Sequence, residues 1–90
     1  MSKVSDKKIK KLKEHILSIL YETHFNPIFT SNIAEDLIRD EEFTLRLLIE
    51  LKKEGFIKEI NKNTDGKRYL SRKKWILQSK IYDQYKILSH

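Results

Sequence analysis

The backbone of this chain is interrupted by very few residues that break regular structure. Its ninety residues include one proline, Pro27, and two glycines, Gly55 and Gly66. Proline disfavours helical geometry in the residue before it, and glycine is the usual residue where the backbone must adopt a left-handed turn. We therefore expect major breaks between elements at these three positions, with long regular segments between them.

Two segments on either side of Pro27 show apolar residues at helical spacing. Ser5 or Asp6 caps a first helix that fades over residues 23–26, and Thr30 or Ser31 begins a short second helix. The core face of the first helix consists of Ile9, Leu12, Ile16, Leu17 and Leu20. That of the second helix consists of Ile33, Ala34, Leu37 and Ile38.

A third helix is predicted between two strong end signals. Asp40 caps its start, and Glu41 and Glu42 are placed favourably against the positive end of the helix dipole. The helix runs to about Glu54, and Gly55 is the expected left-handed residue after its last turn.

The pattern around this helical core is typical of short strands. Residues 28–29 can form an edge strand, residues 56–62 a second strand and residues 67–71 its return. The Asp65-Gly66 pair between the last two predicts a hairpin turn.

Ser71 then caps a last helix that passes through Trp75 to about Leu88, giving a C-terminal helix over residues 72–88. The predicted fold class is α+β, mostly helical: a three-helix core with a β-hairpin and an added C-terminal helix, in one domain over residues 1–90. The 39% apolar content suffices for one core of this size.

Charge is concentrated at two basic segments. The net charge is +6; residues 1–13 carry six lysines and one aspartate, and residues 61–74 carry six basic residues and one aspartate. Residues 14–59 between them are net acidic. This distribution favours a polyanionic partner held by the two basic segments.

Other functional classes have little support in the sequence. There is no cysteine, and His15 and His24 are nine residues apart with no clustered carboxylates, so we expect no metal and no cofactor. Neither glycine belongs to a phosphate-binding loop, and no catalytic arrangement of side chains is evident, so we expect no enzyme activity. No apolar run reaches the roughly 20 residues of a membrane span, and we expect a cytoplasmic protein.

Three segments in order resemble the winged helix-turn-helix family, in particular MarR-like and PadR-like small transcriptional regulators of archaeal, viral or bacterial type. Thr30 to Leu37 resembles the opening of that family's second helix, with a hydroxyl cap. Leu48 to Ile57 resembles the end of its third helix and the start of the wing, and Tyr69 to Lys73 resembles the end of the wing. The resemblance covers residues 7–74, the winged-helix core.

The resemblance implies binding to double-stranded DNA. The third helix would read the major groove, where Arg46 matches an exposed polar or basic position and Thr44 is shifted toward the core. The wing bases would contact phosphates, and backbone N–H groups at residues 30–32 could hold a phosphate at a helix N-terminus. The candidate DNA-binding residues are Ser31, Asn32, Thr44, Arg46, Lys62, Lys67 and Arg68.

The predicted C-terminal helix has an apolar face that could pack on the first helix or form a homodimer. Regulators that this chain resembles often dimerise through such a helix, which favours the homodimer. The candidate interface residues are Trp75, Leu77, Ile81, Tyr85 and Leu88.

The predicted third helix also supports an alternative function. Its outer face carries Glu41, Glu42, Phe43, Leu45 and Ile49, which suit phosphate contacts poorly. Capping and extra packing explain these residues, but a protein-interaction module that docks a partner through this helix explains them as well.

Overall fold

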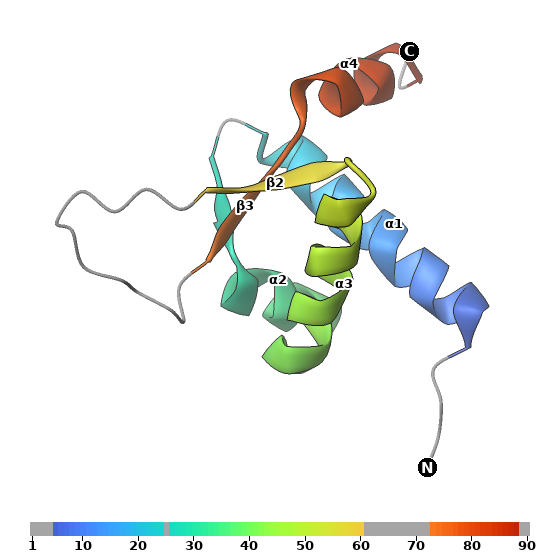
Figure 1. Cartoon of the computed structure of the whole chain (residues 1–90), viewed down its shortest axis with the longest axis vertical. Coiled ribbons are helices and arrows are strands. Elements are labelled where there is room, and N and C mark those ends of the chain that lie inside the picture. Colours follow the sequence, from blue (N-terminus) through green and yellow to red (C-terminus); the bar gives the residue numbers. More distant parts are fainter. Residues whose placement is uncertain (1–4, 25, 61–72, 89–90) are drawn as a thin grey trace, which may run out of the picture.

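The computed structural model describes residues 5–24, 26–60 and 73–88 (Figure 1). The described elements run in the order helix, strand, helix, helix, strand, strand, helix, which confirms the mostly helical α+β class. They are α1 (Asp6–Glu22), β1 (Ile28–Phe29), α2 (Thr30–Leu37), α3 (Glu41–Lys53), β2 (Ile57–Ile60), β3 (Lys74–Leu77) and α4 (Ser79–Leu88).

The helix ends follow the predicted local signals in two of three helices. The hydroxyl of Ser5 accepts a hydrogen bond from the Lys8 N–H at 3.3 Å, and the carboxylate of Asp40 accepts one from the Phe43 N–H at 2.8 Å. Gly55, after α3, has a φ of +86°, as expected of a left-handed residue. The hydroxyl cap predicted for α2 is wrong, because Phe29 occupies the cap position and makes no side-chain hydrogen bond there.

The three strands form an antiparallel sheet in the order β1-β3-β2. Ile28 pairs with Trp75 on one side of β3, and Ile57 pairs with Leu77 on the other. The predicted edge strand at residues 28–29 is therefore confirmed. The hairpin turn at Asp65-Gly66 and the return strand at 67–71 lie outside the described residues.

The predicted helix over residues 72–88 is wrong at its start, because Lys74–Leu77 is a strand and α4 begins only at Ser79. Trp75 and Leu77 alternate with more exposed neighbours, which is the two-residue period of a strand. Leu77 lies four residues before Ile81, so it matches the helical spacing of the following segment by coincidence. Residues 74–77 form a strand because they pair with both β1 and β2.

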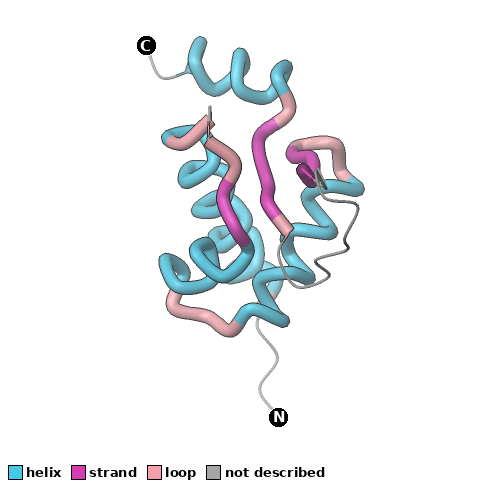
Figure 2. The backbone as a smooth tube through the Cα atoms, turned by 90° about the vertical axis from the view of Figure 1, so that its left-hand side faces the viewer, coloured by secondary structure: helices cyan, strands magenta, loops and turns pink. Residues whose placement is uncertain are grey.

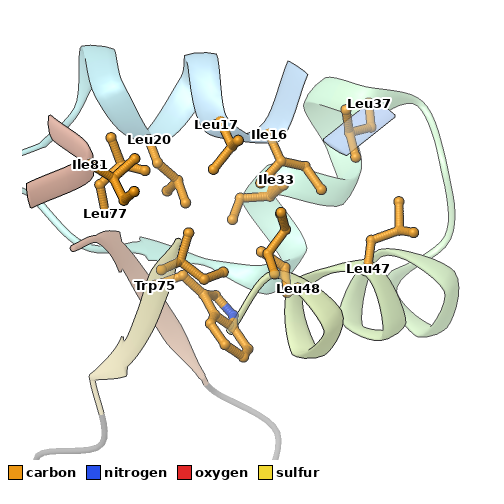
Figure 3. Close-up of a cluster of buried hydrophobic side chains, with 12 residues drawn as sticks. Ile16, Leu17, Leu20, Ile33, Leu37, Leu47, Leu48, Trp75, Leu77 and Ile81 are labelled. Carbon is orange, nitrogen blue, oxygen red and sulfur yellow. The ribbon is translucent and has the colours of Figure 1, made fainter. Parts of the chain in front are cut away.

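The core lies between the sheet and the first three helices (Figure 3). Helix α1 contributes Ile16, Leu17 and Leu20, while α2 contributes Ile33 and Leu37. The remaining members of the cluster are Leu47, Leu48, Leu51, Ile57, Trp75, Leu77 and Ile81. Ile38 was predicted to join them, but it is 89% exposed, because the backbone turns left-handed there and α2 ends.

The interior holds a polar link between β3 and α2. The indole N–H of Trp75, which is fully buried, donates to the Thr30 hydroxyl oxygen at 2.8 Å. Thr30 in turn donates to the Lys73 carbonyl through both its hydroxyl, at 3.3 Å, and its backbone N–H, at 3.1 Å. This network fixes the start of α2 against the start of β3. Trp75 therefore belongs to the monomer core, and its predicted role in a dimer interface is wrong.

Helix α4 lies beyond the sheet, at the opposite end of the molecule from the turn between α2 and α3 (Figures 1 and 2). Its aromatic side chains hold it to α1: the Tyr21 ring lies 5.2 Å from that of Tyr82 and 5.5 Å from that of Tyr85. His24 stacks on Tyr82 with a centroid distance of 3.9 Å. No helix among the described residues is long and apolar enough to cross a membrane.

The Trp75–Thr30 link predicts the effect of a nearly isosteric substitution. Thr30→Val removes the acceptor and leaves the buried indole N–H without a partner, which we expect to lower the free energy of unfolding by about 1–3 kcal/mol. Urea denaturation measures this. In a Trp75→Phe background the same substitution should cost much less, since no indole N–H remains. Equal losses in both backgrounds would contradict the assigned role of the bond.

The backbone at Ile38 predicts a stabilising substitution. Its φ of 57° and ψ of 48° place a β-branched residue in the left-handed region, where the Cβ costs about 1–2 kcal/mol. Ile38→Asn should raise the unfolding free energy by about 1 kcal/mol, because asparagine tolerates this region and little buried apolar surface is lost. Thermal denaturation provides the measurement. Ile38→Val, which keeps the branching, is the control and should leave the midpoint unchanged.

Candidate nucleic-acid interface

The N-terminus of α2 presents polar groups to solvent. Ser31 and Asn32 are exposed, and the first turn contains no acidic residue. The first N–H groups of a helix have no partner within the helix, and they carry its positive dipole end. The Thr30 N–H is already bonded to the Lys73 carbonyl, so the predicted phosphate contact is limited to the N–H groups that follow.

Helix α3 presents Arg46 to solvent but buries Thr44. Arg46 is exposed and forms no ion pair with another described residue; Glu50, one helical turn further along α3, contacts Lys13 at 2.8 Å instead. The Thr44 side chain is fully buried, and its hydroxyl donates to the Asp40 carbonyl at 2.8 Å. Thr44 lies on the same face as Leu47, Leu48 and Leu51, so its predicted DNA contact is wrong in this fold.

The apolar residues on the outer part of α3 are less available than the sequence indicated. Phe43, Leu45 and Ile49 are half-buried and pack against the core cluster. The guanidinium of Arg39 lies 5.7 Å from the centroid of the Phe43 ring and covers part of it. Packing accounts for much of this apolar surface. Docking of a protein partner through α3 stays a prediction.

Two lysines at the start of β3 lie beside the N-terminus of α2, and neither is among the candidate DNA-binding residues predicted above. The Lys73 carbonyl accepts the Thr30 N–H, while its ammonium lies 3.8 Å from Glu59. The Lys74 ammonium lies 4.9 Å from the centroid of the Phe29 ring, directly before α2. The run of basic residues at 72–74 is a sequence signal that could have identified these lysines. The predicted helix over residues 72–88 separated them from α2, whereas β3 brings them next to it.

Glu59 on β2 joins the sheet to α3 through ion pairs. Its carboxylate contacts the Lys52 ammonium at 3.3 Å and the Lys73 ammonium at 3.8 Å, and its side chain is only 13% exposed. The two contacts tie the end of α3 to the base of the β2–β3 pair. The wing bases Lys62, Lys67 and Arg68 lie outside the described residues.

The histidine-containing contacts do not form a metal site. His15 lies 3.4 Å from Asp36, joining exposed positions on α1 and α2. Within residues 5–24, 26–60 and 73–88, no three His, Asp or Glu side chains gather closely enough to hold a metal ion.

Solved structures of transcription regulators superpose on this arrangement. MepR of Staphylococcus aureus in complex with DNA gives a TM-score of 0.71 at 20% identity, over 93% of this chain and 68% of MepR. A MepR variant gives 0.70 at 20% identity, over 88% and 54%, respectively. A variant of Lactococcus lactis ZitR, a zinc-responsive MarR family member, gives 0.67 at 24% identity, over 99% and 56%.

This chain has a MarR-like winged helix-turn-helix fold. It spans between 54% and 68% of the length of these three structures. No family model matches the sequence, and no curated protein matches it significantly.

The structure separates the predicted site residues that are exposed from those that are buried. Ser31, Asn32 and Arg46 are exposed on the α2–α3 pair, and Thr44 is buried. Among the predicted dimer residues, Leu77 and Ile81 belong to the core with Trp75, being 1% and 7% exposed. Their predicted role in an interface is therefore wrong, since a partner cannot reach them. Tyr85 is half-buried and packs on Tyr21, and Leu88 is 80% exposed, so the interface role of these two stays a prediction.

Proposed function

We propose that this chain binds double-stranded DNA and regulates transcription, without enzyme activity of its own. The observation that carries the proposal is the exposed Arg46 on α3, together with the exposed Ser31 and Asn32 at the start of α2, whose first turn contains no acidic residue. A helix fits the major groove of B-DNA, which is about 12 Å wide, while the N-terminus of the preceding helix holds the phosphate backbone. The likeness to MepR, solved with DNA, supports this use of the fold.

The charges define how such a complex is held. Asp40, Glu41 and Glu42 at the start of α3 repel phosphates, so the affinity must come from basic residues around the helix pair. Lys74 beside α2 and the wing bases Lys67 and Arg68 are the candidates. We infer a complex held mainly through phosphates, with Arg46 providing a limited reading of base edges. We propose that such a regulator acts in the cytoplasm.

We further propose that the protein acts as a homodimer. A two-fold dimer places two α3 helices about one DNA turn apart, roughly 34 Å, and matches a palindromic site. Tyr85 and Leu88 on α4 are the predicted interface residues that a partner can reach. Because α4 lies at the opposite end of the molecule from the α2–α3 turn, pairing there leaves the DNA-binding face open.

Replacing Arg46 tests the role of α3. Arg46→Ala should weaken binding to a selected duplex by about 1–3 kcal/mol and relax base preference at one position, because a contact to a base edge is lost. Fluorescence anisotropy with duplexes from a random-site selection measures both effects. Lys80→Ala, which removes the same charge from exposed α4, is the matched control and should bind like wild type. A wild-type chain that binds no duplex at low salt overturns the proposed function.

Replacing the wing bases tests the phosphate contacts. Lys67→Ala with Arg68→Ala should weaken binding to all duplexes alike, and each lost phosphate contact should reduce the slope of log K against log salt by about 1. The measurement is a salt titration of duplex affinity. An unchanged slope would remove these two residues from the interface.

A further inference from the structure

Arg39 lies in the turn between α2 and α3, on a backbone that is held from both sides. Its N–H donates to the Ala34 carbonyl at 3.0 Å and closes the end of α2. The left-handed backbone of Ile38, directly before it, allows this bond. Directly after it, Asp40 caps α3. The side chain of Arg39 therefore begins from a fixed point at the start of α3.

The far end of the Arg39 side chain is also held. Its guanidinium lies over the Phe43 ring, 5.7 Å from the ring centroid, which is within the range where an aromatic face attracts a cation. Phe43 is half-buried and packs against the core cluster, so its ring is a fixed support. The N–H donors of a guanidinium lie in its plane, and contact over a ring leaves them available. Arg39 thus presents its hydrogen-bond donors from a defined position.

Arg39 is exposed, and it forms no ion pair with another described residue, although several acidic residues are close in sequence. Two of these acids have other partners. The Asp40 carboxylate accepts the Phe43 N–H at 2.8 Å, and Asp36 lies 3.4 Å from His15. Arg39 therefore has its donors available for a ligand outside the chain.

Arg39, Phe43 and Arg46 follow one another at spacings of four and three residues, which is the spacing of neighbours on one face of a helix. Arg39 precedes α3 by two residues, but its contact with Phe43 brings its guanidinium to that face. Both arginines are exposed. The outer face of α3 thus offers two guanidinium groups, at the end of the molecule opposite α4 (Figure 1).

The chemistry around Arg39 favours a base edge over a phosphate. The carboxylates of Asp40, Glu41 and Glu42 surround the start of α3 and repel phosphates. The major-groove edge of a G·C pair presents two acceptors on guanine and one amino donor on cytosine. Arginine donates to the guanine acceptors through its fork, and a carboxylate accepts from the cytosine amino group. A surface with arginine and glutamate side by side therefore matches a G·C pair.

We propose that Arg39 is a specificity-determining residue that reads one guanine, that Arg46 reads a second, and that Phe43 is a positioning residue for Arg39. The inference rests on the proposed DNA binding and identifies the base pairs that the domain prefers. Seven helical residues rise by about 10 Å, and base pairs stack about 3.4 Å apart. The two preferred G·C pairs therefore lie within about three base pairs of each other.

Random-site selection with the full-length chain and its variants tests this assignment. The wild type should select two G·C positions; Arg39→Ala should lose the preference at one of them, and Arg46→Ala at the other. Arg39→Ala should weaken binding to the selected duplex by about tenfold or more. Arg39→Lys keeps the charge but lacks the fork, so it should bind unrelated duplexes like the wild type and still lose the preference. Lys80→Ala, on exposed α4, is the matched control. An unchanged preference in Arg39→Ala or Arg39→Lys overturns the base-reading role.

Substitutions of Phe43 test the positioning role. Phe43→Leu keeps an apolar side chain but removes the ring, and it should reduce the preference only at the position that Arg39→Ala affects. Phe43→Tyr retains the ring and should restore the preference. Thermal denaturation checks that both variants fold. An unchanged preference in Phe43→Leu, or a loss spread evenly over all positions, overturns the positioning role.

Failure of this inference and failure of the proposed function give different results. A wild type that binds duplex DNA with a base preference that Arg39→Ala leaves intact overturns the inference and leaves the proposed function in place. A wild type that binds no duplex at low salt overturns both.

Discussion

The buried hydrogen bond from Trp75 to Thr30 joins the parts of this fold on which the proposed site depends. It links the central strand β3 to the first residue of α2, across 45 positions of the sequence. Since both groups are buried, water cannot replace either partner, and the bond selects one placement of α2 against the sheet. The Lys73 carbonyl, which accepts two hydrogen bonds from Thr30, reinforces that placement. The N-terminus of α2 and the base of the wing are thereby held as one unit.

The same link explains why the proposed phosphate-binding residues lie close together. Because β3 is held at the start of α2, Lys74 lies against Phe29, immediately before the exposed Ser31 and Asn32. Glu59 binds Lys52 and Lys73, so the far end of α3 is tied to the same strands. The position of Arg46 relative to α2 thus depends on the packing of α3 and on these ion pairs together. A binding surface assembled from short elements needs such links, since eight residues of α2 are not stable alone.

Local signals allowed much of this fold to be predicted from the sequence, and their limits explain the errors. Ser5, Asp40 and Gly55 act on their own neighbours, so the helix ends they mark were predictable. Lys74–Leu77 was assigned to a helix because its strand character depends on pairing with β1 and β2, which are distant in sequence. Trp75 was assigned to a dimer surface for the same reason. The burial of Thr44 depends on the helical phase of α3. The exposure of Ile38 depends on the left-handed end of α2.

The proposed function places DNA binding at the α2–α3 end of the molecule and dimerisation at the α4 end. In the proposed complex, the acidic start of α3 weakens the attraction of a single domain for DNA, because these side chains repel phosphates. Two weak units held in fixed geometry bind a palindromic duplex more tightly, because the second contact becomes intramolecular. In the proposed dimer, pairing uses a surface remote from the α2–α3 turn, and α4 lies at the opposite end of the molecule from that turn. The acidic start of α3 and the exposed end of α4 are therefore both consistent with the proposed dimer.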